Sequence, residues 1–198
     1  MKNHSFGENK TSWLDNLIAY LRYRRLSAYL SGANSLTDIG CGYNVPFLKW
    51  AENKFKITNL AGIDLSINEE LSSNNHYDLK IGDLNLTLPW ADSSQELITS
   101  LAVLEHLVDP EHNLKEIYRL LKTGGRLILT TPAPRAKWLL EFLAFKLGLI
   151  DSTEIRDHKK YFSQGDLKNI LRETGFSSDK IVARSFMGGF NNLVICTK

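Results

Sequence analysis

Short apolar runs alternate with stretches of helical spacing along most of the chain. The apolar runs predict strands at residues 36–39, 57–63, 77–82, 96–101, 126–131, 181–185 and 193–197. Between several of them, apolar residues recur at helical spacing and predict helices at residues 45–53, 111–121 and 163–172. Alternation of this kind forms parallel βαβ units. We therefore expect a doubly wound α/β sheet whose ligand lies beyond the carboxyl ends of the strands.

A longer helical segment precedes the first strand. Its apolar residues are Trp13, Leu14, Leu17, Ile18, Leu21 and Tyr29. Arg22, Arg24 and Arg25 lie between them, and Thr11 or Ser12 is placed to cap the helix. We predict an amphipathic helix over residues 11–29 that covers the sheet and has a solvated basic edge. Contact of this edge with phosphate or with a membrane is the alternative.

The first predicted strand ends in a glycine turn. Residues 36–44 read LTDIGCGYN, so Gly40 and Gly42 stand between the strand and the next predicted helix. Glycines lack Cβ atoms, so the turn can adopt backbone angles that other residues avoid, and a ligand can lie against it. Free N–H groups at the start of the helix would then face that ligand.

The spacing of this turn distinguishes between ligands. A dinucleotide fingerprint needs a third glycine where Val45 stands, and the chain contains no Gly-Lys-Ser/Thr phosphate loop. Asp38 lies just before the first glycine. A carboxylate in this position repels a pyrophosphate and suits a cationic ligand.

The sequence Asp-Ile-Gly-Cys-Gly at residues 38–42 resembles the first motif of the class I S-adenosylmethionine-dependent methyltransferases. Asn44 stands where many members have a third glycine, and asparagine tolerates left-handed backbone angles. The resemblance implies a Rossmann-like fold with a seven-stranded, mostly parallel sheet, an antiparallel last strand and helices on both faces. It also implies S-adenosyl-L-methionine as the cofactor, which carries an ammonium and a sulfonium.

Further motifs extend the resemblance over residues 36–198. Asp64 ends the second strand where a doubly wound fold binds a ribose diol, and one carboxylate can accept from two hydroxyls. Carried over from the family, Asp83 and Leu84 contact adenine, and the backbone near residues 100–101 lines the methionine part. The implied cofactor site consists of Asp38, Gly40, Cys41, Gly42, Asn44, Asp64, Leu65, Asp83, Leu84, Ser100 and Leu101.

Two histidines are candidates for the methyl-acceptor side. In the family, the position of His158 lies just before a helix that reaches the acceptor, and an imidazole with a pKa of about 6.5 is suited to removing a proton. We take His158, with Tyr161, as the first candidate for acceptor orientation or general base, and His106 as the second. Structural hydrogen bonding is the alternative role. Cys41 and Cys196 lack metal-ligand spacing, and we predict no metal site.

Residues 137–150, KWLLEFLAFKLGLI, are apolar almost all round and are interrupted by Glu141 and Lys146. An ordinary core helix, a lid over an apolar acceptor, a peripheral contact with lipid and a dimer interface all fit this pattern. If the segment is a lid, Trp138 and Phe142 are the side chains expected to contact the acceptor.

Length and composition fit one α/β domain. The chain has 198 residues, of which 43% are hydrophobic and 23% charged. We expect a helical extension at residues 1–33 and a Rossmann-like core at residues 34–198. A net charge of +2 makes nucleic acid an unlikely partner. The polar N-terminus lacks the core of a signal peptide, and no apolar run approaches a membrane span, so we expect a cytoplasmic protein.

The predicted function is methyl transfer to an oxygen or nitrogen of a small acceptor, either free or linked to lipid or glycan. An NAD-dependent oxidoreductase and a non-catalytic module that binds S-adenosylmethionine are the alternatives. The family's Asn/Asp-Pro-Pro-Tyr/Phe element is missing after the fourth strand, which disfavours amines of nucleic-acid bases as acceptors. Both a monomer and a homodimer are compatible with the sequence.

Overall fold

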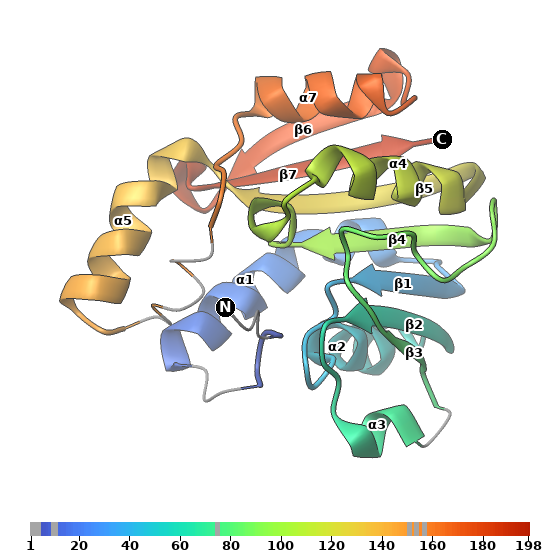
Figure 1. The fold of residues 1–198 in the computed structure, drawn as a ribbon, viewed down its shortest axis with the longest axis horizontal. Coiled ribbons are helices and arrows are strands. Elements are labelled where there is room, and N and C mark those ends of the chain that lie inside the picture. The colour runs from blue at the N-terminus through green and yellow to red at the C-terminus, as the bar shows by residue number, and fades with distance from the viewer. Residues whose placement is uncertain (1–4, 9–11, 74–75, 150–151, 153–154, 156–157) are drawn as a thin grey trace.

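The computed structural model describes residues 5–8, 12–73, 76–149, 152, 155 and 158–198. Its centre is a seven-stranded sheet in the order β3-β2-β1-β4-β5-β7-β6 (Figure 1). The strands are β1 (Ser35–Ile39), β2 (Asn59–Asp64), β3 (Asp78–Ile81), β4 (Gln95–Leu101), β5 (Leu121–Pro132), β6 (Ile181–Phe186) and β7 (Asn191–Thr197). This sheet confirms the predicted fold class.

The pairing of the strands fixes where a ligand can bind. β1 pairs in parallel with β2 on one side and with β4 on the other, so the chain reverses its direction across the sheet between them. In doubly wound sheets, this switch point leaves a crevice beyond the carboxyl ends of the two strands. β7 runs antiparallel between β5 and β6, which confirms the predicted antiparallel last strand.

Helices cover both faces of the sheet (Figure 1). Along β5, Leu127 and Leu129 belong to one hydrophobic cluster and Ile128 to the other, because successive side chains of a strand point to opposite faces. The first cluster includes α4 and α7, and the second includes α1 and α2. The helices are α1 (Trp13–Leu30), α2 (Pro46–Phe55), α3 (Glu69–Ser73), α4 (Pro110–Leu120), α5 (Lys137–Glu141) and α7 (Gln164–Glu173).

Shorter helical turns connect these elements. They are η1 (Leu104–His106), η2 (Pro134–Ala136), η3 (Phe142–Lys146), η4 (Ser178–Lys180) and η5 (Met187–Gly189). Two of the longer helices begin with capping boxes: the Ser12 hydroxyl accepts from the Asp15 N–H, and the Ser163 hydroxyl accepts from the Asp166 N–H. The predicted cap at Ser12 is thus confirmed, whereas Thr11 lies outside the described residues.

The start of β5 differs from the prediction. The helix was predicted to end at residue 121 and α4 ends at Leu120, but β5 begins at Leu121 and not at residue 126. The Gly124 N–H donates to the Lys198 carbonyl, and the Gly125 carbonyl accepts from the Lys198 N–H, both at 2.9 Å. Pairing with the end of the chain therefore draws the glycines into the sheet.

The first helix is less simply amphipathic than its spacing predicts. Leu26 and Leu30, in its second half, are fully buried against the sheet cluster. In the first half, Trp13 is 67% exposed, and Leu17 and Leu21 are also exposed. The first half of α1 extends beyond the carboxyl ends of the strands, where several of its side chains line the ligand cavity described below.

The apolar segment at 137–150 is not a core helix. It forms α5 and then widens into the π-helical turn η3, in which Ala144 is the buried side chain. Trp138, Phe142, Phe145 and Leu147 are exposed. None of the helices in the described part of the chain has the length and apolar character needed to cross a bilayer.

Candidate functional site: a cavity at the carboxyl ends of the strands

A cavity of about 330 Å³ lies beyond the carboxyl ends of β1, β2 and β4. Cavities of this size hold drug-sized molecules. The strand tips and the glycine turn form one wall, and α1 forms another. The remaining lining comes from η1, from α5 and η3, and from the turn between β6 and β7. The cavity therefore lies where the switch point predicts a ligand.

The glycine turn is packed too closely to accept side chains at Gly40 and Gly42. Gly40 and Gly42 have left-handed φ angles of 81° and 75°. A Cβ on Gly40 would lie 2.3 Å from Val103 Cγ2, and one on Gly42 would lie 3.0 Å from the Phe6 carbonyl oxygen. Both positions therefore require glycine, for their backbone angles and for the close neighbours.

Asn44 does not play the part expected of it. The left-handed residue that precedes α2 is Val45, with a φ of 45°. Asn44 is exposed and lies outside the cavity lining, where its side chain accepts from Asn68 Nδ2 at 3.1 Å and donates to the Gly7 carbonyl at 3.3 Å. It holds neighbouring loops together at the edge of the site.

The N–H groups of the turn at residues 40–43 have acceptors within the protein. Those of residues 40 and 41 donate to the Ile63 carbonyl oxygen at 2.9 and 3.1 Å, and that of residue 42 donates to the Asp64 carboxylate at 2.7 Å. The N–H of residue 43 donates to the Phe6 carbonyl at 2.8 Å. The N–H groups of the turn itself are therefore used within the protein, and the carboxylates beside the turn offer charge. The prediction of free donors concerned the start of α2, which these hydrogen bonds do not test.

Asp38 is buried at the tip of β1. Its side chain is 2% exposed and accepts a hydrogen bond of 2.6 Å from the Thr99 hydroxyl. Burial raises the pKa of Asp38 well above its ordinary value, the Thr99 hydrogen bond opposes this effect, and the nearby Asp64 charge adds to it. A positive ligand in the cavity would stabilise the ionised form.

Asp64 lies at the tip of β2 and is 8% exposed. It accepts from the Gly42 N–H at 2.7 Å, from the Leu65 N–H at 2.8 Å and from the Ser5 hydroxyl. Burial raises the pKa of Asp64, while the hydrogen bonds from Ser5, Gly42 and Leu65 act in the opposite direction. Ser5 was not among the predicted site residues, and nothing in its sequence context marks it as one.

The other predicted cofactor residues divide into two groups. Asp83 is exposed, lines the cavity and accepts from the Asn85 N–H and side-chain amide at 2.9 and 2.8 Å. Leu65, Leu84, Leu101 and Cys41 also line the cavity. Ser100 is fully buried within β4, outside the lining. Burial raises the pKa of the Cys41 thiol, so this side chain stays protonated at neutral pH.

Arg22 and Tyr23 on α1 also line the cavity and were missed as site residues. Arg22 was expected on a solvated basic edge with Arg24 and Arg25, but Arg22 Nε is buried and has no hydrogen-bond partner among the described residues. Burial raises the pKa of the Tyr23 hydroxyl, which also senses the charges of Arg22 and Asp38. Arg22 thus brings a positive charge to the cavity that Asp38 also lines.

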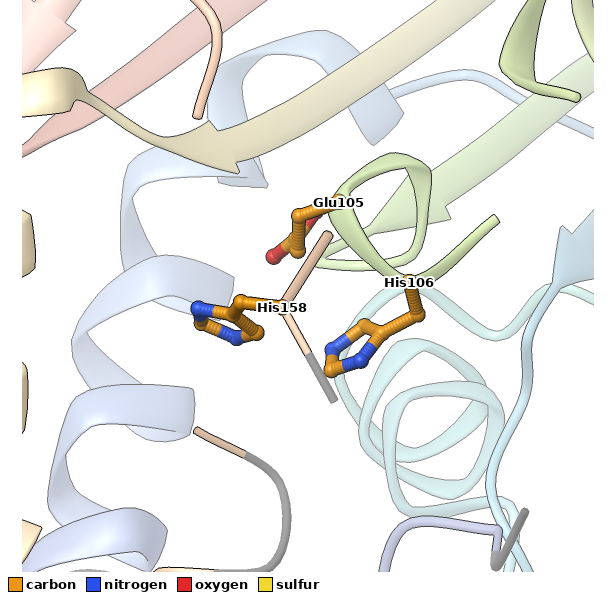
Figure 2. A group of neighbouring side chains, drawn as sticks. All are labelled: Glu105, His106 and His158. Carbon is orange, nitrogen blue, oxygen red and sulfur yellow. The ribbon is translucent and has the colours of Figure 1, made fainter. Parts of the chain in front are cut away.

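Glu105, His106 and His158 meet on another side of the cavity (Figure 2). Glu105 and His106 belong to η1, which follows β4. The Lys159 N–H donates to the Glu105 carbonyl at 2.8 Å and Lys159 Nζ donates to the His106 carbonyl at 2.7 Å, which fixes the segment of His158 against η1. The two imidazole rings stand at 72° with centroids 4.7 Å apart. Glu105 was missed in the sequence, where it has no distinguishing spacing.

Tyr161 contacts this cluster from outside the cavity lining. Its hydroxyl lies 3.0 Å from His158 Nδ1. Burial raises the pKa of Tyr161 to about 12, and the charges of Glu141 and Glu105 add to the effect, so the phenol keeps its proton at neutral pH. Burial, with Lys159, lowers the pKa of His106 to about 4, so this imidazole is neutral. The structure therefore brings His106, His158 and Tyr161 together, and their role toward an acceptor stays a prediction.

An apolar wall faces the cluster. Leu139, Leu140 and Leu143 line the cavity from α5 and η3. Trp138 and Phe142, which were expected to contact a ligand, are 63% and 47% exposed on the outer side of the same segment. The three leucines share one helical face, but the segment is apolar almost all round, so its sequence could not show which face turns inward.

A sheet of this order, with a glycine turn and acidic strand tips around a crevice, is the architecture of class I S-adenosylmethionine-dependent methyltransferases. Residues 12–180 match the family described as "Methyltransferase domain". The chain belongs to this family, and S-adenosylmethionine is the cofactor that the family implies.

Individual relatives have low sequence identity to this chain. A 27-O-demethylrifamycin SV methyltransferase of Amycolatopsis mediterranei is 27% identical over 64% of this chain and 49% of its own. A demethylmenaquinone methyltransferase of Lactobacillus johnsonii is 29% identical over 71% of this chain and 57% of its own. The chain thus spans about half the length of these relatives. The structure of a SAM-dependent methyltransferase from Archaeoglobus fulgidus aligns with a TM-score of 0.70 at 17% identity, over 92% of this chain and 94% of that one.

Substituting Gly40 tests the glycine turn. Gly40→Ala should lower the free energy of unfolding by about 2–4 kcal/mol, because it combines a left-handed φ with a clash against Val103. Gly32→Ala is the matched control, since Gly32 has a φ of 78° but open space around its missing Cβ, and it should cost about 1 kcal/mol. Urea denaturation measures both, and equal losses would contradict the close packing of the turn.

Asp38 should contribute less to stability as the pH rises. Its folded-state pKa is raised, so the folded protein binds a proton more tightly than the unfolded chain does. The contribution is present at low pH and is lost as the pH rises from about 3.8, the ordinary value, through the raised folded-state value. Asp38→Asn keeps the acceptor for Thr99 without the charge, and should stabilise the ligand-free protein at neutral pH by about 1 kcal/mol.

Thermal unfolding of both proteins at about pH 5 and about pH 8 measures this difference. The advantage of the Asp38→Asn variant should be larger at the higher pH. A variant that is less stable than the parent at the higher pH would show that the Asp38 charge is already compensated inside the protein.

Proposed function

We propose that this chain transfers the methyl group of S-adenosylmethionine to an oxygen or nitrogen of a small acceptor. One observation carries the proposal: Asp38, Asp64 and Asp83 follow three neighbouring strands and line one cavity, together with a glycine turn that leaves room for a ligand. This order suits a ligand with a positively charged end, a ribose and a base. It fits the cofactor that the family implies.

Each part of the cofactor has a partner in this proposal. Asp38 attracts the ammonium group, and the guanidinium of Arg22, which lines the same cavity, is suited to the carboxylate beside it. Asp64 accepts from the ribose hydroxyls, in the position where it now accepts from Ser5. Asp83 accepts from the adenine amino group, and Leu84 and Leu65 pack beside the rings.

The protein chiefly aligns the reactants and excludes water. When bound, S-adenosylmethionine supplies an activated methyl group on its sulfonium, and a lone pair of the acceptor displaces the sulfur in line. In such a transfer the carbon–sulfur bond would be replaced by a bond from carbon to the acceptor oxygen or nitrogen, and a protonated acceptor would then lose its proton. His158, oriented by the Tyr161 hydroxyl, is the first candidate to orient the acceptor or to take this proton, and His106 is the second.

The acceptor is proposed to be apolar over much of its surface. The leucines at positions 139, 140 and 143 offer it an apolar wall, opposite the polar cluster of Glu105 and the histidines. Two relatives are named for acceptors that are small molecules, a demethylrifamycin and demethylmenaquinone. A lipid-linked or glycan-linked acceptor remains within this description.

Isothermal titration calorimetry tests the cofactor. S-adenosylhomocysteine should bind with a Kd of about 1–100 μM, whereas NAD should give no measurable heat. Asp64→Asn should weaken binding at least about tenfold, since the amide offers the ribose a weaker acceptor. Asp179→Asn, at an exposed site outside the cavity, is the matched control and should leave the affinity unchanged. Tight binding of NAD without S-adenosylhomocysteine would replace this proposal with an oxidoreductase.

The apolar wall is tested with an acceptor recovered from a screen of metabolites and lipids in the presence of methyl-labelled cofactor. Replacing both Leu140 and Leu143 by Ala should raise the KM of the acceptor at least about tenfold, because apolar contact is lost, with little change in the KM of the cofactor. The pair Trp138→Ala and Phe142→Ala, on the outer side of the same segment, serves as control. Equal effects of the two pairs would refute a wall that faces inward.

A further inference from the structure

Three potential metal ligands meet in the cavity. The donor atoms of Glu105, His106 and His158 all lie within 4.8 Å of one another (Figure 2). They come from two segments that are far apart in the sequence, η1 after β4 and the stretch before α7. The backbone hydrogen bond from Lys159 to Glu105 holds these segments in register. The prediction of no metal site considered only the cysteines and could not detect this juxtaposition.

We propose that Glu105, His106 and His158 bind a divalent transition-metal ion such as Zn²⁺, Co²⁺ or Fe²⁺. This inference rests on the proposed function, because it concerns the acceptor side of the same cavity. Two imidazoles and one carboxylate are the donor set that such ions prefer, and a site with three protein ligands keeps positions open for another molecule. Mg²⁺ and Ca²⁺, which favour oxygen donors, fit it less well.

The geometry requires only a small closure. With metal–donor distances of about 2.0–2.2 Å, neighbouring ligands lie about 3.0–3.4 Å apart. The donor atoms here are separated by at most 4.8 Å, so side-chain movements of about 1 Å each bring them onto one ion. Glu105 is 1% exposed, and a buried carboxylate is stabilised by a positive charge beside it.

The residues around these three ligands are arranged as residues around metal ions in proteins often are. The Tyr161 hydroxyl contacts His158 Nδ1 at 3.0 Å, and a hydrogen bond to the second ring nitrogen is the usual way in which a metal-binding imidazole is oriented. All three ligands line the cavity, so the open positions of the ion face the bound acceptor. An acceptor with a hydroxyl or two adjacent oxygens would bind the ion directly. With the ion bound, His158 and His106 would act as ligands and not as bases. The ion itself would lower the pKa of that hydroxyl and so favour the oxyanion that attacks the methyl group.

Metal binding is measured without reference to activity. The purified protein is treated with a chelator, dialysed and titrated with Co²⁺, whose visible absorption reports nitrogen ligation, and with Zn²⁺ by calorimetry. We expect one equivalent to bind with micromolar affinity or better. Glu105→Gln, His106→Gln and His158→Gln should each weaken binding at least about tenfold. His112→Gln, on α4 outside the cavity, is the matched control and should not change it.

The affinity for S-adenosylhomocysteine is measured on every variant with and without the metal. It shows that each variant is folded, and it separates the two proposals: if this ligand fails to bind, the proposed function fails whatever the metal does. Absence of saturable Co²⁺ or Zn²⁺ binding in a protein that binds S-adenosylhomocysteine would overturn the metal site. Equal metal affinity in the parent and in all three ligand variants would also overturn it. An anomalous diffraction peak between the three side chains in crystals soaked with Co²⁺ would confirm it directly.

Discussion

The site depends on negative charge that is buried where parallel strands end. Asp38 and Asp64 lie at adjacent strand tips beside the glycine turn, and both are nearly inaccessible to water. Burial disfavours the ionised form of each carboxyl and so raises its pKa. Hydrogen bonds from Thr99, Gly42 and Leu65 offset part of this cost. What remains is a preference for positive charge in the cavity. The buried carboxylates therefore favour a positively charged ligand, whatever the shape of that ligand.

The rest of the cavity is built by segments outside the regular βαβ units. The first half of α1 and the segment formed by α5 and η3 both line the cavity. The chain just before α1 meets the chain just after η3, where the Ser12 hydroxyl donates to the Leu149 carbonyl at 2.6 Å. Strand tips thus define the part of the cavity suited to a nucleoside, whereas these added segments define the part left for a second molecule. Differences in second substrates between related chains can arise in these segments without any change to the sheet.

Much of this arrangement could be predicted from the sequence, because strands and turns obey local rules. The seven strands, the capped helices and the acidic residues at strand ends follow from periodicity and from the glycine spacing. The inward-facing side of residues 137–149 could not be predicted, because apolar side chains occur on every face of this segment. Nor could the meeting of Glu105 with His158, or that of Ser5 with Asp64, because such contacts depend on how distant segments fold back onto the sheet.

The contact between Ser5 and Asp64 has a consequence for how the site fills. The Ser5 oxygen also accepts from the Ser66 N–H at 2.8 Å, so residues 5–8 are docked where a sugar hydroxyl would bind under the proposed function. Binding of the nucleoside would then require residues 5–8 to move away from Asp64. The free energy of this movement would weaken the observed affinity. Under the proposed function, the affinity for the nucleoside would therefore depend on how firmly residues 5–8 are held in this position.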